Sequence, residues 1–200
     1  MSTVPEILLA SASPRRRELF GHLGYPFTCT SVDIDETPHP GEAADTTAMR
    51  LALEKARAAR AGHPDALIVG SDTLVVLDDT VLGKPRDADE AKDMLTRLQG
   101  RDHRVVTAFA LLHPDGREVV EASVTAVRFR PMTADEIAAY VATGEPLDKA
   151  GAYGIQERGA VFVEGVEGDY FTVVGLPLCL LAQRMAKLIG PLPAVRPHTP

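Results

Sequence analysis

The sequence predicts an α/β fold in which helices flank a mixed, twisted β-sheet. Short apolar runs alternate with helical segments through the first half of the chain, and such alternation is typical of α/β proteins. Residues 105–112 and 118–129 then flank the turn-forming sequence 113–116 (HPDG), which favours a hairpin. The chain of 200 residues has the length of one domain. We expect a single domain over 1–190, followed by a loose, proline-rich tail over 191–200.

Local patterns predict the first elements in order. The apolar run 6–10 (EILLA) predicts a buried strand, and Pro14 suits the first turn of the next helix, where the N–H that proline lacks has no partner. Residues 27–32 predict a second strand. The spacing of Ala, Leu and Met over 45–61 is helical, and the run 66–70 (ALIVG) predicts a third, buried strand.

A strand turn and a helix start follow this buried strand. Residues 74–77 extend the apolar pattern, and the acidic pair 78–79 can turn the chain back toward 81–85. Asp87 with Glu90 carries a reciprocal capping signal, because each side chain can bond a backbone N–H near the other. We therefore expect a helix that opens at Asp87.

The last third of the chain continues with another capped helix. Thr133 with Glu136 repeats the reciprocal capping signal. Residues 161–163 and 171–174 are short apolar runs that predict a late pair of strands. The longer apolar run 178–189 predicts a final helix.

Composition and charge exclude several classes of protein. The balance of 21 basic against 28 acidic residues gives a net charge of −7, which disfavours a general binder of nucleic acid or acidic membranes. Cys29 and Cys179 form no CxxC pair, so neither a disulfide framework nor a thiolate zinc site is indicated. No apolar run reaches the roughly 18–20 residues that span a bilayer, and the N-terminus has no signal-peptide pattern. We expect a cytoplasmic protein without nucleic-acid or membrane partners.

The first candidate binding segment is 11–16 (SASPRR), between a predicted strand and a predicted helix. Backbone N–H groups and the helix dipole at such a junction attract anions. Ser11, Ser13, Arg15 and Arg16 add donors that suit phosphate oxygens. The alternative is an ordinary helix start with solvated arginines.

The second and third candidates carry an acidic residue and an amide. Asp72 follows an apolar strand, a frequent place for a metal ligand or general base, although a turn-forming Asp explains the pattern as well. Lys84 lies in Gly-Lys-Pro, which is not a P-loop. Small residues surround Tyr153 and Gln156 within 148–156, and they permit either close approach of a planar ligand or a flexible surface loop.

Together these segments resemble the Maf family of nucleoside triphosphate pyrophosphatases. The match runs in family order from about residue 6 to residue 182, and the Ser-x-Ser-Pro-Arg-Arg opening is specific. The similar segments are 9–16, Glu36, 54–56, 71–73, 83–85, 98–100 with His103, 148–156 and 174–177.

The resemblance implies a fold like that of inosine triphosphatases, with the site in a cleft of a mixed sheet. It also implies hydrolysis of a nucleoside triphosphate between the α and β phosphates with a divalent metal, Mg²⁺ or Mn²⁺. A homodimer is compatible with the family. The alternative from another class is a nucleotide-binding regulator that restrains cell division without turnover.

A triphosphate substrate brings roughly four negative charges, so the barrier to its hydrolysis is lowered mostly by stabilising this charge and positioning the reacting groups. We expect cationic contacts and hydrogen bonds to the phosphates, and two carboxylates on the metal and the attacking water. The family match makes Asp72 the general base. The phosphate-binding residues are expected to be Ser11, Ser13, Arg15, Arg16, Lys55 and Lys84, and the metal ligands Glu36 and Asp72.

Within the family, 148–156 (DKAGAYGIQ) resembles the branch that prefers dTTP and UTP, with modified pyrimidines as further targets. The branch that prefers 7-methyl-GTP carries a different segment there and is the alternative. By that comparison Arg15, Thr73 and Gln156 tune specificity. The Gln156 amide offers both a donor and an acceptor to the O4/N3 edge of uracil or thymine.

Overall fold

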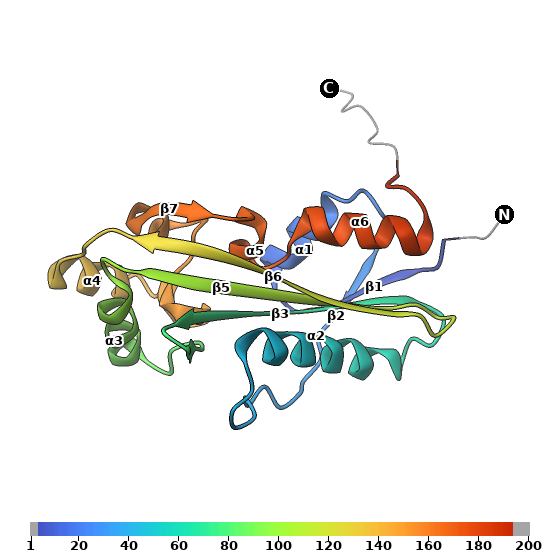
Figure 1. Cartoon of the computed structure of the whole chain (residues 1–200), viewed down its shortest axis with the longest axis horizontal. Coiled ribbons are helices and arrows are strands. Elements are labelled where there is room, and N and C mark those ends of the chain that lie inside the picture. Colours follow the sequence, from blue (N-terminus) through green and yellow to red (C-terminus); the bar gives the residue numbers. More distant parts are fainter. Residues whose placement is uncertain (1–3, 194–200) are drawn as a thin grey trace.

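A seven-stranded mixed sheet forms the centre of the protein, as predicted, with the strand order β2-β1-β3-β5-β6-β7 and with β4 paired to β3 (Figure 1). The computed structural model describes residues 4–193, so most of the expected loose tail, 194–200, lies outside the described residues. The strands are β1 Ile7–Ala10, β2 Thr28–Thr30, β3 Leu67–Leu77, β4 Thr80–Leu82, β5 Asp102–Leu112, β6 Glu118–Phe129 and β7 Val163–Glu167. The helices are α1 Pro14–Gly21, α2 Ala44–Arg60, α3 Ala88–Leu98, α4 Ala134–Val141, α5 Tyr170–Val174 and α6 Leu178–Ile189.

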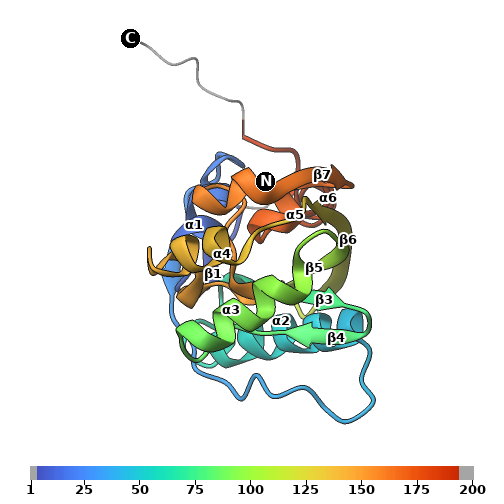
Figure 2. The same ribbon diagram turned by 90° about the vertical axis from the view of Figure 1, so that its left-hand side faces the viewer.

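The first three strands create a crevice at one end of the sheet. β1 lies between β2 and β3 and is parallel to both, so the chain reaches β2 through α1 and β3 through α2. Figure 2 shows α1 and α2 on opposite sides of the sheet. Where the strand order reverses in this way, a crevice opens at the carboxyl ends of the central strands, and α/β proteins bind ligands there.

Alternate side chains of the sheet pack against helices on its two faces. On one face Leu9 packs with Phe20 of α1 and Leu181 of α6, and on the other face Leu8 packs against the buried alanines of α2. These small residues let α2 approach β3 closely, because a Cβ at Gly70 would lie only 2.9 Å from the Ala56 Cβ. The close packing of α2 brings its polar side chains within reach of β3.

The predicted hairpin and both predicted N-cap residues are confirmed, but Glu90 accepts a hydrogen bond from the Arg86 N–H instead of the Asp87 N–H. β5 and β6 pair antiparallel along their whole length around the turn at 113–116. The Asp87 side chain accepts hydrogen bonds from the backbone N–H groups of Asp89 and Glu90. Thr133 and Glu136 form a complete capping box at the start of α4. Within residues 4–193, no helix combines the length and the apolar character that a membrane crossing needs.

The structure corrects two expectations about strands. Residues 171–174 belong to α5 instead of a strand, because Asp169 caps the helix by accepting from the Phe171 N–H. A short apolar run does not distinguish a strand from a buried helical turn. The strand predicted over residues 66–70 does not end before Asp72. β3 continues through 71–73, and β5 pairs beside it there. Asp72 therefore lies inside a strand.

Candidate active site

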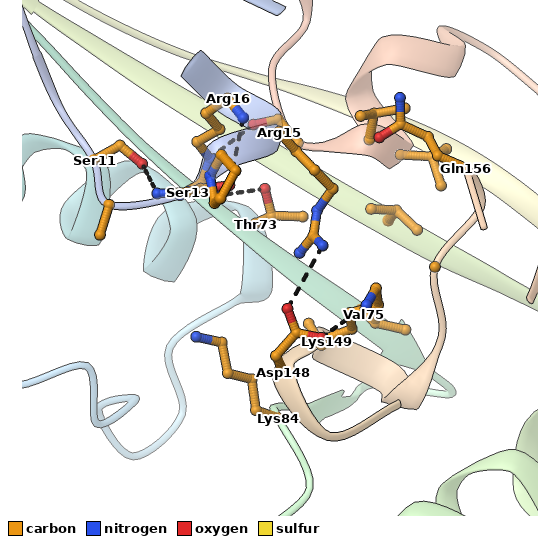
Figure 3. Close-up of a pocket in the computed structure, with 18 of the residues that line it drawn as sticks. Ser11, Ser13, Arg15, Arg16, Thr73, Val75, Lys84, Asp148, Lys149 and Gln156 are labelled. Carbon is orange, nitrogen blue, oxygen red and sulfur yellow. Dashed lines mark hydrogen bonds and ion pairs between the residues drawn. The ribbon is translucent and has the colours of Figure 1, made fainter. Parts of the chain in front are cut away.

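The candidate site lies at a gap along one edge of β3. That edge pairs with β1 over 67–70 and with β4 over 75–77, and the described residues place no strand beside 71–74. A cleft of about 390 Å³ opens there, lined on one side by the segment 10–16 (Figure 3). Because side chains alternate along a strand, Asp72 and Thr73 point to opposite faces of β3, and the gap makes both faces reachable from one cleft.

The segment that follows β1 presents hydroxyl groups and a helix N-terminus to the cleft. Ser13 caps α1 by accepting a hydrogen bond from the Arg16 N–H (3.4 Å), and Ser11 Oγ accepts from the Ser13 N–H (3.1 Å). Pro14 occupies the first turn, as predicted. The start of α1 therefore offers the positive end of a helix dipole and two hydroxyl groups to an anion in the cleft.

Arg16 connects three parts of the site. Its Nε donates to the Gly175 carbonyl (2.9 Å), and its Nη2 donates to Thr73 Oγ1 (2.8 Å). Burial lowers the pKa of Arg16, and the charges of Asp72 and Glu36 partly oppose this effect. Arg16 lines the cleft, but two of its donor groups are already bound to the protein. It therefore holds α1, β3 and the end of α5 together as well as facing the cleft.

Lys55 of α2 joins the two expected metal-binding carboxylates. Its Nζ lies 2.6 Å from Glu36 Oε1 and 2.6 Å from Asp72 Oδ1. Lys55 and Glu36 line the cleft, whereas Asp72 is buried behind the ammonium group. Burial raises the pKa of Glu36, and the hydrogen bond and charge of Lys55 outweigh it, so the pKa is lowered overall.

The two carboxylates fit a hard divalent cation in chemistry and in placement. Glu36 and Asp72 contact the same ammonium group, so the two carboxylates lie close together beside the cleft. Mg²⁺ is commonly held by one or two carboxylates together with substrate phosphates and waters. Among residues 4–193, no group of three or more His, Cys, Asp or Glu side chains assembles as a metal site. Phosphate oxygens would therefore have to complete the coordination.

Two further cations face the cleft from opposite sides. Lys84, in the segment after β4, lines the cleft and forms no ion pair with the residues described here. Arg15 of α1 points across the opening, where its Nη1 lies 3.7 Å from Asp148 Oδ2 and 3.8 Å from Glu157 Oε1 (Figure 3). These distances are long for strong ion pairs, so an anion in the cleft can compete with the two carboxylates for Arg15.

Apolar side chains from the sheet and α5 line another part of the cleft. They lie beside the lining segment that carries Tyr153 and Gln156 together with the charged residues Asp148, Lys149 and Glu157. Tyr153 is held in place by a hydrogen bond of 2.8 Å between its hydroxyl and His103 Nε2. Apolar walls with a few placed polar groups are typical of sites for small planar ligands. The side chains are Val75, Val105, Tyr153, Ile155, Gln156 and Val173.

His103 gives the stability a specific dependence on pH. Burial lowers its pKa from 6.5 to about 4, so it stays neutral in the folded protein where the unfolded chain takes up a proton. Between these two values the unfolded state binds more protons, and stability falls as the pH falls. Relative to a His103→Phe variant, we expect the wild type to lose roughly 3 kcal/mol of unfolding free energy between about pH 6.5 and 4. Urea titrations of both proteins measure the difference, and parallel pH profiles would contradict it.

Two residues of the site were not identified from the sequence as functional. Lys149 is buried, with its Nζ 2.7 Å from Asp148 Oδ1 and 3.4 Å from Glu157 Oε1, and it fixes these carboxylates beside Arg15. Thr107 is fully buried in β5, directly across from Thr73. The available signal for Thr107 was one hydroxyl in the apolar run 105–112.

The structure brings the expected residues to one place. The cleft is lined by Ser11, Ser13, Arg15, Arg16, Glu36, Lys55, Thr73, Lys84 and Gln156. Asp72 is the exception, since it reaches the cleft only past Lys55. The arrangement places cationic groups, hydroxyl groups and apolar side chains in one cleft.

Several curated relatives are similar in sequence over most of this chain. The dTTP/UTP pyrophosphatase of Moorella thermoacetica is 54% identical over 182 residues, covering 90% of this chain and 94% of the relative. The dTTP/UTP pyrophosphatase of Myxococcus xanthus is 50% identical over 187 residues, with 94% of both chains covered. That of Symbiobacterium thermophilum is 46% identical over 187 residues, covering 94% of this chain and 96% of the relative.

A solved structure shows a similar fold, and a family model matches most of the chain. The Ham1 protein of Staphylococcus aureus has the same fold, with a TM-score of 0.51 at 17% identity, over 90% of this chain and 99% of that protein. The family model described as Maf-like protein matches residues 6–188. The chain belongs to the Maf family.

Proposed function

We propose that this protein hydrolyses dTTP and UTP, and modified pyrimidine triphosphates, to the nucleoside monophosphate and pyrophosphate. The observation that carries the proposal is one cleft that joins cationic groups to a set of apolar side chains beside Gln156. The name dTTP/UTP pyrophosphatase, which relatives at 46–54% identity carry, supports the same substrates here.

The cationic end suits the triphosphate. Arg15, Lys55 and Lys84 bring positive charge to the cleft, and Ser11 and Ser13 lie at the N-terminus of α1. Groups that already point at the phosphates need little rearrangement as charge develops in the reaction. The apolar side chains of the cleft then receive the base, where the Gln156 amide N–H can donate to a carbonyl oxygen of uracil or thymine.

Asp72 is proposed as the general base. Its Oδ1 accepts a hydrogen bond from Lys55, and among the described residues no donor bonds to Oδ2, which can take a proton from water. The water oxygen adds to the α-phosphorus, the bond to the bridging oxygen breaks, and pyrophosphate leaves with that oxygen. The proton from the water goes to Asp72.

Glu36 and Asp72 are also the residues that would hold a divalent cation together with phosphate oxygens. When bound, such a cation acidifies the attacking water and neutralises phosphate charge. Lys55 keeps the two carboxylates beside the cleft, and Lys84 adds charge from the other side.

Product analysis tests the proposal directly. The purified protein is assayed with Mg²⁺ or Mn²⁺ against dTTP, UTP, CTP, 7-methyl-GTP and the ordinary purine triphosphates. We expect dTTP and UTP to be the best substrates and to yield pyrophosphate with the monophosphate. A preference for 7-methyl-GTP would contradict the assigned substrate but retain the reaction. Release of orthophosphate would contradict the reaction.

A further inference from the structure

Two neighbouring residues, Arg16 and Thr107, fix the direction of the hydrogen bonds that the Thr73 hydroxyl makes. Thr73 lines the cleft and lies directly across from Thr107 in the pairing of β3 with β5. The two hydroxyl oxygens are 2.9 Å apart, and either one has the geometry to donate. The next partner of each oxygen decides which one does.

The Thr107 hydroxyl donates its hydrogen to the Thr172 carbonyl. Its Oγ1 lies 2.7 Å from the Thr172 carbonyl oxygen of α5, which can only accept. That carbonyl is free of the usual helical bond because the N–H groups of Gly175 and Leu176 both donate to Phe171. A threonine carries one hydroxyl hydrogen, so Thr107 has none left for Thr73 and must accept from it.

Thr73 therefore donates its own hydroxyl hydrogen to Thr107 Oγ1. Its oxygen also accepts a hydrogen bond from Arg16 Nη2 at 2.8 Å, and a guanidinium is always a donor. One lone pair of the Thr73 oxygen remains. The hydroxyl that faces the cleft consequently offers an acceptor and no donor, although an isolated threonine offers both.

We propose that Thr107 is a positioning residue for base selection, which it performs by holding Thr73 as a pure hydrogen-bond acceptor toward the N3–H of uracil or thymine. Cytosine presents an unprotonated N3 at this place, so its lone pair would oppose that of Thr73. The inference rests on the proposed pyrimidine triphosphate substrate and gives a physical reason for the expected preference for UTP over CTP. Thr107 itself is fully buried and touches no substrate.

Substitution of Thr107 tests this selection. Thr107→Val keeps the shape of the side chain and removes the acceptor, which frees the Thr73 hydrogen to donate to cytosine N3. We expect the ratio of kcat/KM for UTP to that for CTP to fall about tenfold, the usual effect of one mismatched polar contact. Thr107→Ser retains the hydroxyl and is the matched control, with the wild-type ratio.

The outcomes separate this inference from the proposed function. An equal loss with both substrates in Thr107→Val would indicate a structural role only and overturn the inference. A change in Thr107→Ser as large as that in Thr107→Val would overturn it as well. A wild type that hydrolyses neither UTP nor dTTP would overturn the proposed function first, and the inference with it.

A second measurement does not depend on the folding of Thr107→Val. The ratio of kcat/KM for UTP to that for CTP is compared between the wild type and Thr73→Val, which has no acceptor for N3–H. We expect this ratio to fall about tenfold in Thr73→Val. An unchanged ratio in Thr73→Val would overturn the inference.

Discussion

Replacement of Asp72 by Asn is expected to lower kcat for UTP by about 10²–10⁴-fold, the usual contribution of a general base. The amide keeps the size of the side chain, and its carbonyl oxygen can still accept the hydrogen bond from Lys55. We therefore expect the fold to be unchanged and UTP to bind with an affinity close to that of the wild type. Pyrophosphate release measures the first quantity, and calorimetric titration of the variant with UTP measures the second.

The matched control is Asp79→Asn, which makes the same chemical change at a residue on the exposed turn between β3 and β4. Asparagine tolerates the positive φ of 53° at this position. Its kcat should equal that of the wild type. An Asp72→Asn enzyme with more than about a tenth of the wild-type kcat would exclude Asp72 as the general base.

Replacement of Lys55 by Met is expected to give the largest loss of stability in the site. Lys55 is the cation that Asp72 and Glu36 share, and the Asp72 side chain is only 8% exposed. Removal of one partner of a buried ion pair typically costs about 3–5 kcal/mol, because the other charge stays buried without compensation. For a protein of this size, that cost corresponds to a fall in Tm of roughly 10 °C. Differential scanning calorimetry measures it.

Two comparisons identify the ion pair as the cause of that loss. Lys84→Met removes a cation from the same cleft, where the described residues offer it no ion pair, and should leave Tm nearly unchanged. The double variant with Lys55→Met and Asp72→Asn removes both charges and should recover most of the lost stability. A double variant no more stable than Lys55→Met would show that the loss arises from packing.

Much of the fold follows from local signals that the sequence carries. The caps at Asp87 and Thr133 and the turn at 113–116 act within a few residues, so their effects are visible in the pattern of residues. Where one sequence pattern is compatible with both a strand and a helix, the prediction was wrong. Residues 171–174 are apolar enough for a strand, but the Asp169 cap makes them helical.

The sequence also indicated the segments 11–16, 71–73 and 148–156, each of which supplies residues to the cleft. The relations between them were not predictable. The pairing of β3 with β5 past Gly70 places Asp72 within a strand, and close packing of α2 brings Lys55 against it. Neither contact follows from spacing along the chain.

The sequence by itself therefore determined the α/β class and indicated the segments that line the cleft. The tertiary structure alone decided that strand pairing stops on one edge of β3 at 71–74 and opens the cleft. It also decided the direction of the hydrogen bonds at Thr73. That direction depends on Arg16, Thr107 and the Thr172 carbonyl, which lie between 34 and 99 residues away in the chain. Only folding brings such distant groups within hydrogen-bonding distance, and each has a fixed capacity to donate or accept.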